Sequence, residues 1–244
     1  MKSALFPLLI MFSLLIPVWA IGAEETTMEK NDELSQRQQR IIPIAAFTAD
    51  GDMDRLKPAL NQGLDAGLTV NEIKEVLVHL YAYTGFPRSL NALSAFMAVM
   101  DERKAKGIED AIGRAASPVS SSFNRDEYGA KVRATLAGRE ADISNARWQL
   151  FSPVIDTFLK EHLFADIFVR DVISHQDREL VTIAALANMT GTEGQLRFHF
   201  GAAMNSGLTE TQMKDFISVL RTTVSEAQAD SAQAILSDVL SSRK

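Results

Sequence analysis

The sequence predicts an all-α protein made of two fused helical repeats, and three observations support this prediction. A short motif occurs twice, as GLTVNEIK at 67–74 and as GLTETQMK at 207–214. From Ile41 onward apolar residues recur at helical spacing, and no stretch of β-branched residues alternates at a period of two. In each motif a threonine stands three residues before Glu72 or Gln212, which is the capping box that begins a helix. Each motif is therefore expected to form the turn between two helices.

The first residues of the chain have a different composition. Lys2 precedes an apolar run, ALFPLLIMFSLLIP at 4–17, and small residues follow at 18 and 20. This pattern predicts a signal peptide over 1–20, and a cut after Ala23 is also compatible with it. The protein is then expected to be exported, to the periplasm or outside the cell, with no membrane contact after cleavage. The alternative is an uncleaved anchor, because 3–23 carries no charge.

The expected elements follow in chain order. Residues 24–39 form a polar lead-in, and helices follow from 41. An apolar stripe after Thr69 predicts a helix, which Gly85 and Pro87 interrupt before a second helix over 88–104. Further helices are expected over 126–136, 153–169, 178–188 and 193–206, with one or two more over 209–241. We therefore assign 24–112 to the first repeat, 113–125 to a linker and 126–244 to the second repeat.

Composition excludes several kinds of function. The 244 residues carry a formal net charge of −6 and include no cluster of basic residues, so we expect no nucleic-acid partner. No cysteine is present, which excludes thiol redox chemistry and thiolate metal sites within this sequence. The sequence contains neither a His-x-x-x-His pair nor a phosphate-binding glycine loop. We predict no metal and no cofactor.

The two repeats have lost different polar residues. When Thr69 is set against Thr209, the position of His199 is Ala59 in the first repeat. Beyond the turn the loss is reversed, because His79 and Tyr83 of the first repeat correspond to Val219 and Thr223 in the second. One interpretation is a composite site, in which the front half of the second repeat faces the back half of the first. The alternative is drift after duplication, which would leave a fold without a site.

Two long segments carry a family resemblance. They are RELVTIAALANMTGTEGQLRFHFGAAMNSGLTETQMKDF at 178–216 and AGLTVNEIKEVLVHLYAYTGFPRSLNALSAFMAVM at 66–100. Both resemble the core of carboxymuconolactone decarboxylases. The stretch FLKEHLFADIFVRD at 158–171 resembles exported members with two repeats. The related alkylhydroperoxidase-D branch uses a Cys-x-x-Cys pair, for which this chain has Thr192 and Gln195.

The resemblance implies a cofactor-free decarboxylation. Loss of carbon dioxide from the lactone ring sends electrons to the lactone carbonyl, and the protein must stabilise the oxyanion and deliver a proton. His199 matches the family histidine and is our candidate for proton transfer, unless it is an ordinary core histidine. Glu179 matches a family glutamate that could orient His199 or act as an acid, or it serves only the helix dipole. Glu193 is a candidate second acid, with a solvated surface position as the alternative.

Three further residues are candidates for substrate binding. His79 and Tyr83 are four residues apart, so they share a helix face, and either could donate a hydrogen bond to a lactone or carboxylate oxygen. Arg88 could hold a substrate carboxylate, with an ordinary surface arginine as the alternative.

The predicted function is a cofactor-free carbon–carbon lyase acting on a small lactone or carboxylated carbonyl compound. The alternative is a non-catalytic binding or stress-related protein on the same fold, and a peroxidase-type redox helper is disfavoured by the missing cysteines. The resemblance implies rings of six for single-repeat relatives, so we expect three two-repeat chains to form a homotrimer.

Overall fold

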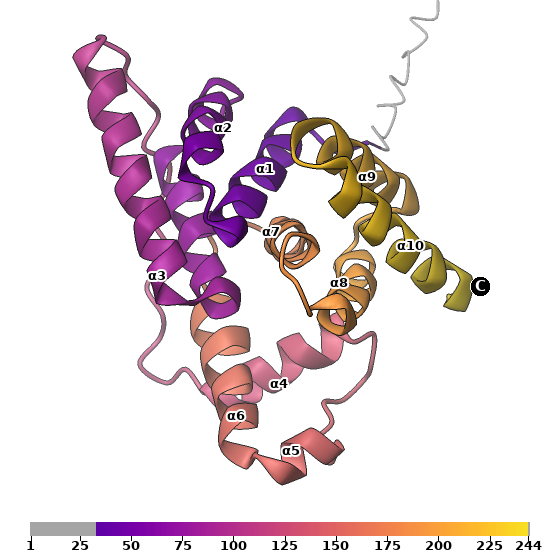
Figure 1. Cartoon of the computed structure of the whole chain (residues 1–244). Coiled ribbons are helices and arrows are strands. Elements are labelled where there is room, and N and C mark those ends of the chain that lie inside the picture. The colour runs from indigo at the N-terminus through magenta and orange to yellow at the C-terminus, as the bar shows by residue number, and fades with distance from the viewer. Residues whose placement is uncertain (1–32, 244) are drawn as a thin grey trace, which may run out of the picture. The chain divides into compact units, whose positions relative to one another are not determined.

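The computed structural model describes residues 33–243, and all regular elements in this part of the chain are helices (Figure 1). The predicted all-α fold is confirmed. The predicted signal peptide at 1–20 and most of the polar lead-in lie outside the described residues. None of the described helices is long and apolar enough to cross a membrane. The elements, in order, are α1 (Gln36–Asp50), α2 (Met53–Asp65), α3 (Val70–Ala105), α4 (Arg125–Leu136), α5 (Arg147–Phe151), α6 (Pro153–Thr157), the π-helix η1 (Phe158–Ile167), α7 (His175–Ala187), α8 (Glu193–Asn205), α9 (Glu210–Thr223) and α10 (Glu226–Ser242).

The two repeated motifs form the same turn. In both, the threonine hydroxyl accepts the backbone N–H three residues on, and the side chain at that position accepts the threonine N–H. The Thr69 N–H donates to Glu72 Oε2 at 2.8 Å, and the Thr209 N–H donates to Gln212 Oε1 at 2.9 Å. Both predicted capping boxes are therefore present, at the starts of α3 and α9.

The duplication is visible in the helix order. An offset of 140 residues carries α2 onto α8 and the start of α3 onto the start of α9. The equivalent helices α1 and α7 pack against each other, with α7 seen end-on at the centre of Figure 1. Buried apolar residues from both repeats form one continuous core, so the repeats share a core instead of forming separate domains.

The predicted interruption near Gly85 is a sharp bend within α3. Gly85 has φ 76° and ψ 161°, a conformation almost restricted to glycine. Ser89, after the bend, donates its hydroxyl proton to the Leu77 carbonyl at 2.7 Å. This contact holds the two arms of α3 together, and Tyr83 lies at the end of the first arm.

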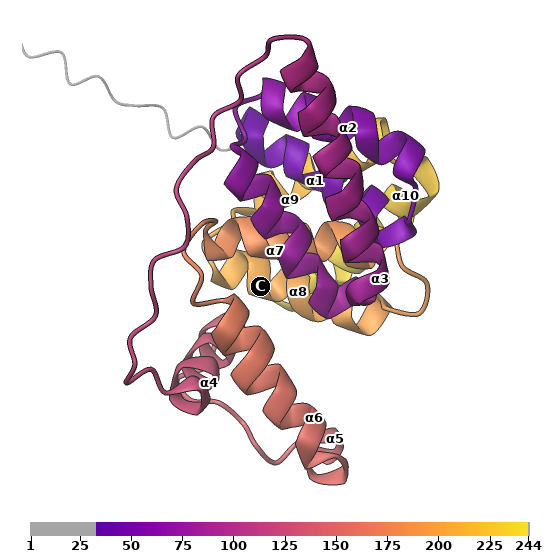
Figure 2. The same cartoon turned by 90° about the vertical axis from the view of Figure 1, so that its left-hand side faces the viewer.

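The helices at the start of the predicted second repeat, α4, α5, α6 and η1, form a second, smaller group (Figure 2). Gly129 of α4 lies so close to η1 that a Cβ atom there would fall 1.9 Å from the Lys160 carbonyl oxygen. The predicted helix over 153–169 is present as the short α6, which continues without a break into the π-helix η1. The short helix α5 was not predicted. The apolar residues buried in this group are Val132, Leu136, Leu163, Phe164, Ile167 and Phe168, with Ala202 from α8.

Candidate functional site

His199 and Glu179 form a buried hydrogen-bonded pair between α8 and α7. The distance from His199 Nδ1 to Glu179 Oε2 is 2.8 Å. Glu179 is fully buried and His199 is nearly so. A buried carboxylate requires a partner, and this histidine provides one. The pair joins two consecutive helices of the second repeat.

This contact determines the roles of the two imidazole nitrogens. An ionised carboxylate only accepts hydrogen bonds, so the pairing with Glu179 places a proton on His199 Nδ1. No described residue bonds His199 Nε2. Nε2 is therefore the ring atom that can exchange a proton with a bound molecule.

Tyr83 of the first repeat lies beside this pair. The Tyr83 ring packs edge-on against His199, with 5.6 Å between centroids, and lies 5.3 Å from the His79 ring. Burial, followed by the nearby Glu179 charge, raises the pKa of Tyr83 far above its usual value, so the phenol stays protonated. The half-sites of the two repeats thus meet within one chain.

His79 is placed differently from its predicted role. Thr182 Oγ1 donates to the Arg178 carbonyl, so His79 Nε2 must donate to Thr182 Oγ1 at 2.9 Å. His79 Nδ1 then accepts from Arg178 at 3.3 Å. Burial, followed by the Arg178 charge, holds the pKa of His79 well below its usual value. Both ring nitrogens are occupied inside the protein, and we therefore assign His79 a positioning role instead of a direct contact with substrate.

A buried ion network, which the sequence did not predict, fixes these helices. Arg178, which is fully buried, donates to Glu75 Oε1 at 2.7 Å and so ties α7 to α3. Arg170 contacts the same carboxylate through two nitrogens, at 2.8–3.0 Å. Because Arg178 precedes Glu179, the network positions the carboxylate that holds His199. The available signal was a charged pair, Arg178–Glu179, at the start of an otherwise apolar helix.

The same carboxylate position is used in both repeats. Asp215 corresponds to Glu75 at the 140-residue offset, and it accepts the Leu34 N–H at 3.1 Å and the Gln39 amide at 3.2 Å. Gln39 in turn corresponds to Glu179. In both cases an acid of one repeat anchors the first helix of the other. Of these two contacts between the repeats, only the contact of Glu75 with α7 lies beside a histidine–carboxylate pair.

Three buried side-chain polar atoms in the described part of the chain have no hydrogen-bond partner, and all belong to this site. They are Tyr83 Oη, Arg178 Nε and Glu179 Oε1. Most buried polar atoms in proteins are paired, and an unpaired one costs about 1–3 kcal/mol. Their concentration around His199 marks this region as a functional candidate.

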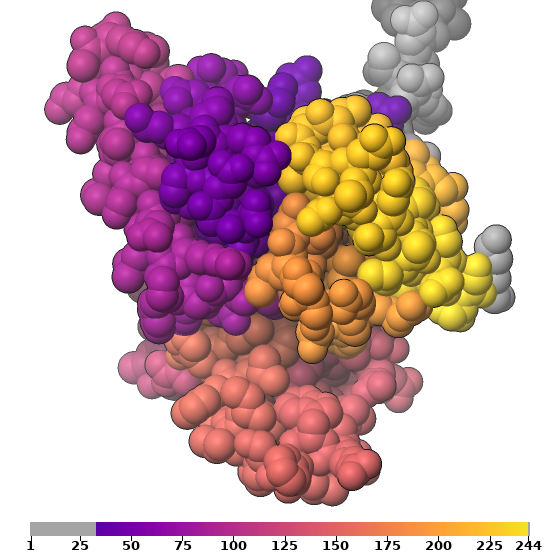
Figure 3. Space-filling model, in the orientation of Figure 1, coloured from indigo at the N-terminus to yellow at the C-terminus, as the bar shows by residue number. Residues whose placement is uncertain are grey.

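A pocket of about 630 Å³ opens beside His199. It lies between α8 and the helices α4, α5 and η1, and Figure 3 shows the surface hollowed between the α7–α8 and α5–α6 regions. The volume suits a small organic molecule. The lining residues are Arg133, Ala137, Arg139, Asp142, Ile143, Trp148, Gln149, Leu159, Phe164, Gly194, Gln195, Phe198 and His199.

Of the predicted site residues, only His199 lines this pocket. Glu179, Tyr83 and His79 belong to the buried cluster beside it, whereas Glu193 and Arg88 lie apart from both. Glu193 is exposed in the first turn of α8 and lines a smaller hollow of about 180 Å³ beside α10. Helical geometry explains this, because six residues turn the side chain away from the face that carries His199. Arg88, after the bend in α3, donates to the Ala49 carbonyl and does not line the pocket. In residues 33–243 no group of three or more potential metal-binding side chains gathers.

The fold and the site define a class of protein: an all-α chain with two fused repeats whose single histidine–carboxylate site combines helices of both. Residues 19–98 and 153–238 match the model of the carboxymuconolactone decarboxylase family. The chain belongs to this family.

The chain is similar to two known proteins. It is 30% identical over 95 residues to a 4-carboxymuconolactone decarboxylase of Acinetobacter baylyi, a match that covers 38% of this chain and 69% of the relative. It is 27% identical over 71 residues to an uncharacterized protein of Methanocaldococcus jannaschii, covering 29% of this chain and 66% of that relative. The matches therefore span about two thirds of the length of each relative.

Proposed function

We propose that the protein is a cofactor-free carbon–carbon lyase that removes carbon dioxide from a small lactone or related carboxylated carbonyl compound. The observation that carries the proposal is the buried His199–Glu179 pair at the wall of the 630 Å³ pocket. The similarity to a 4-carboxymuconolactone decarboxylase supports the same reaction type.

The proposed reaction needs one proton and a place for one electron pair. The bond between the ring carbon and the carboxylate breaks, carbon dioxide leaves, and the electron pair moves through the ring double bond to the lactone carbonyl. Protonated His199 then donates its Nε2 proton to a ring carbon, and solvent returns a proton to His199. Overall, the reaction consumes one carboxylate group and one proton. It produces one carbon dioxide and one new C–H bond on the ring.

Glu179 and Tyr83 would serve this step in different ways. Glu179 keeps the His199 ring oriented and stabilises the imidazolium that precedes proton delivery. Tyr83 carries a protonated and unpartnered hydroxyl next to His199, so it would donate a hydrogen bond to the oxyanion. The missing cysteines argue against a thiol peroxidase.

The test is turnover of a panel of lactones, followed by carbon dioxide release. His199→Gln should lower turnover by at least about 10²-fold, the usual contribution of an acid–base group. The matched control is His162→Gln, because His162 is an exposed histidine on η1 that pairs with Asp166 at 3.0 Å and lies outside the pocket. Saturable binding of lactones without any turnover would contradict the lyase function and support the non-catalytic binding function.

We also propose that the protein acts after export, to the periplasm or outside the cell. The charged start and apolar run of residues 1–20 support this. N-terminal sequencing of the protein from the producing cell should begin at residue 21 or 24, and an intact N-terminus would contradict the proposal.

A further inference from the structure

The outer end of the smaller helical group carries an apolar surface. In both views α5 and α6 lie at the end of this group remote from α1 and α2 (Figures 1 and 2). Six large apolar side chains between 148 and 158 are exposed there, and that of Phe151 is 90% exposed. We call these six residues the apolar tip: Trp148, Leu150, Phe151, Val154, Ile155 and Phe158. Apolar residues gathered in this way on a surface are typical of a contact with a partner or a membrane.

The polarity of this segment is the reverse of that of an ordinary surface helix. In α5 and α6 the buried side chains are Gln149 and Asp156, and both are polar. Gln149 Nε2 donates to Asp156 Oδ1 at 2.9 Å and to the Ile143 carbonyl at 2.7 Å. Polar groups therefore point inwards and apolar groups outwards, whereas a helix that faces water has the opposite arrangement.

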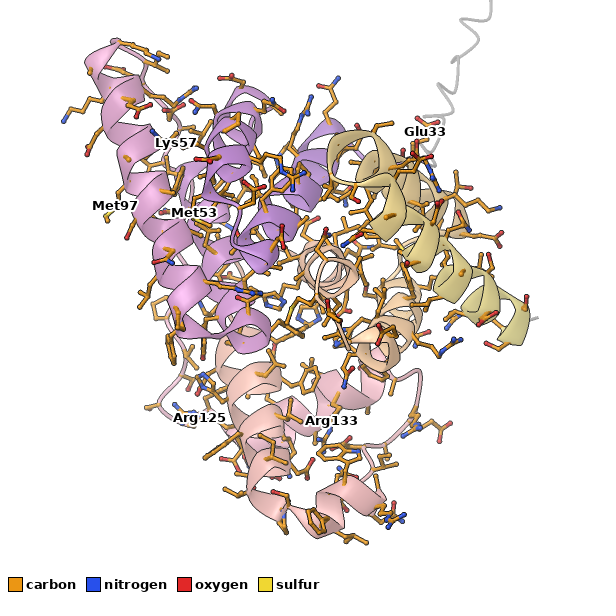
Figure 4. All side chains as sticks on the ribbon, viewed as in Figure 1. Glu33, Met53, Lys57, Met97, Arg125 and Arg133 are labelled. Atoms are coloured by element: carbon orange, nitrogen blue, oxygen red, sulfur yellow. The ribbon has the colours of Figure 1, made fainter. Side chains whose placement is uncertain are left out.

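A buried arginine holds the tip in this orientation. Arg133 of α4, labelled in Figure 4, donates through Nε to Asp142 at 2.8 Å and through another guanidinium nitrogen to Asp156. It thus ties α4 both to the loop before α5 and to α6. Turning the apolar side chains inwards would break these buried charged contacts, which is costly. The exposure of the tip is therefore a fixed feature of the fold.

The surface charge of this segment is small and positive. Residues 143–159 include two charged side chains, Arg147 and Asp156. Asp156 is buried and paired with Arg133, so it adds no negative charge to the surface. Arg147 is exposed and takes part in no ion pair among residues 33–243. A free cation beside apolar side chains complements a layer of anionic lipid headgroups.

The tip fits a lipid layer better than a protein surface. A protein interface carries about one hydrogen bond per 100–200 Å². The six side chains of the tip offer a single hydrogen-bonding group, the indole N–H of Trp148. Trp148 also follows Arg147 directly, and tryptophan and arginine beside apolar residues are the usual anchors of a segment that lies in a membrane interface.

We propose that the apolar tip docks the protein onto an anionic lipid surface, with Phe151 and its neighbours at the acyl boundary and Arg147 among the headgroups. The sequence alone favoured no membrane contact after signal cleavage, and this proposal replaces that expectation. It does not depend on the proposed lyase function. Because Trp148 and Ile143 also line the 630 Å³ pocket, docking would bring the pocket next to the lipid.

The test follows Trp148 at the surface of lipid vesicles. The protein is isolated from the producing cell with Trp19→Phe, so Trp148 is its only tryptophan whether or not the N-terminus is removed. The vesicles contain phosphatidylcholine, alone or mixed with phosphatidylglycerol. Brominated acyl chains should quench Trp148, which an uncleaved N-terminus would not by itself bring to the lipid. Phosphatidylglycerol should raise the affinity by about fivefold, and Arg147→Gln should remove this increase.

Paired variants separate the tip from other exposed apolar residues. Phe151→Ser with Val154→Ser should lower the affinity, measured by Trp148 quenching, by at least about tenfold, because burial of these side chains drives binding. The matched control is Ile112→Ser with Val119→Ser, two exposed apolar residues outside the tip, and it should leave the affinity unchanged. Urea unfolding should be the same in both pairs, since all four side chains are exposed.

Three results would each overturn the proposal: no quenching of Trp148, equal affinity for the two kinds of vesicle, or equal losses in the two pairs of variants. Light scattering without lipid identifies the alternative occupant, a second copy of the chain. If Phe151→Ser with Val154→Ser lowers the mass of the particle and vesicles leave Trp148 unquenched, the tip is a contact between copies.

Discussion

The ring of His199, in the second repeat, lies edge-on to the ring of Tyr83, in the first, with 5.6 Å between centroids. The two residues are far apart in the sequence, and each repeat has lost the partner that the other retains. One chain therefore contains one complete set of these residues.

Removing the Tyr83 hydroxyl should separate catalysis from stability. Tyr83→Phe deletes a buried hydroxyl that has no partner, so stability should stay the same or rise. If that hydroxyl donates to the oxyanion, turnover should fall by about 10²-fold. Turnover and urea unfolding are measured on the same preparation. Tyr81→Phe, which changes a ring stacked on Phe86, is the control, and equal turnover in the two variants would contradict the role of Tyr83.

Replacing Glu179 should lower turnover. Glu179→Gln keeps the size of the side chain but replaces the charged acceptor of the His199 Nδ1 proton with a neutral amide. The hydrogen bond that orients the His199 ring is then weaker, so kcat should fall. Steady-state kinetics and urea unfolding on the same preparation measure this. An unchanged kcat in a stable variant would contradict the role of Glu179.

Breaking the Arg178 network should destabilise the fold. Arg178→Met leaves Glu75 buried with only Arg170 as a charged partner, and it should cost about 3 kcal/mol of unfolding free energy. The control is Arg197→Met, which removes an exposed ion pair with Asp238 and should cost less than about 1 kcal/mol. Urea unfolding measures both. Similar small losses in the two variants would contradict a structural role for the Arg178 network.

The stability of the protein should depend on pH through His79. Its pKa in the folded protein is held well below the usual value, so the unfolded chain takes up a proton below about pH 6.5 that the folded chain excludes. Stability from this source is complete above about pH 6.5 and falls as the pH drops below that value. The slope for one histidine is at most about 1.4 kcal/mol per pH unit.

His79→Gln should reduce this slope, even if the variant is less stable at every pH. Unfolding free energies at about pH 5 and about pH 7.5 provide the comparison. His175, whose pKa burial also lowers, retains its own share of the dependence in both proteins. Identical slopes with and without His79 would show that His79 does not titrate in this way.

The bend at Gly85 should be intolerant of a side chain. Gly85→Ala forces alanine to φ 76° and should cost about 1–3 kcal/mol. Because Tyr83 and Ser89 lie on either side of the bend, activity should fall as well. Gly201→Ala is the control, since a Cβ in that helix would meet nothing closer than 3.8 Å, and it should gain about 0.5–1 kcal/mol. Thermal or urea unfolding measures both.

We expect three chains to assemble into a closed ring. Large apolar side chains on the second arm of α3, including Leu90 and Met97, are exposed, and Met97 points outward in Figure 4. Such residues on one helix are typical of a subunit contact. Light scattering should give the mass of a trimer, and Leu90→Asp should shift it towards a monomer. A monomeric unmodified protein would contradict the expectation.

The sequence by itself determined the helices, the repeat and the identities of the acid–base candidates. Capping boxes, the glycine–proline interruption and helical periodicity are local signals, and local signals can be interpreted one segment at a time. The unequal loss of His79 and His199 counterparts also predicted that the repeats share a single site.

Only the tertiary structure decided which polar residues meet. His199 pairs with Glu179, and both ring nitrogens of His79 form hydrogen bonds inside the protein. Glu193 and Arg88 lie away from the pocket, and Arg178 joins the buried ion network. The physical reason is that hydrogen bonds and burial depend on residues distant in the chain. Spacing along one helix gives the face on which a side chain lies, but not the group that faces it across the core.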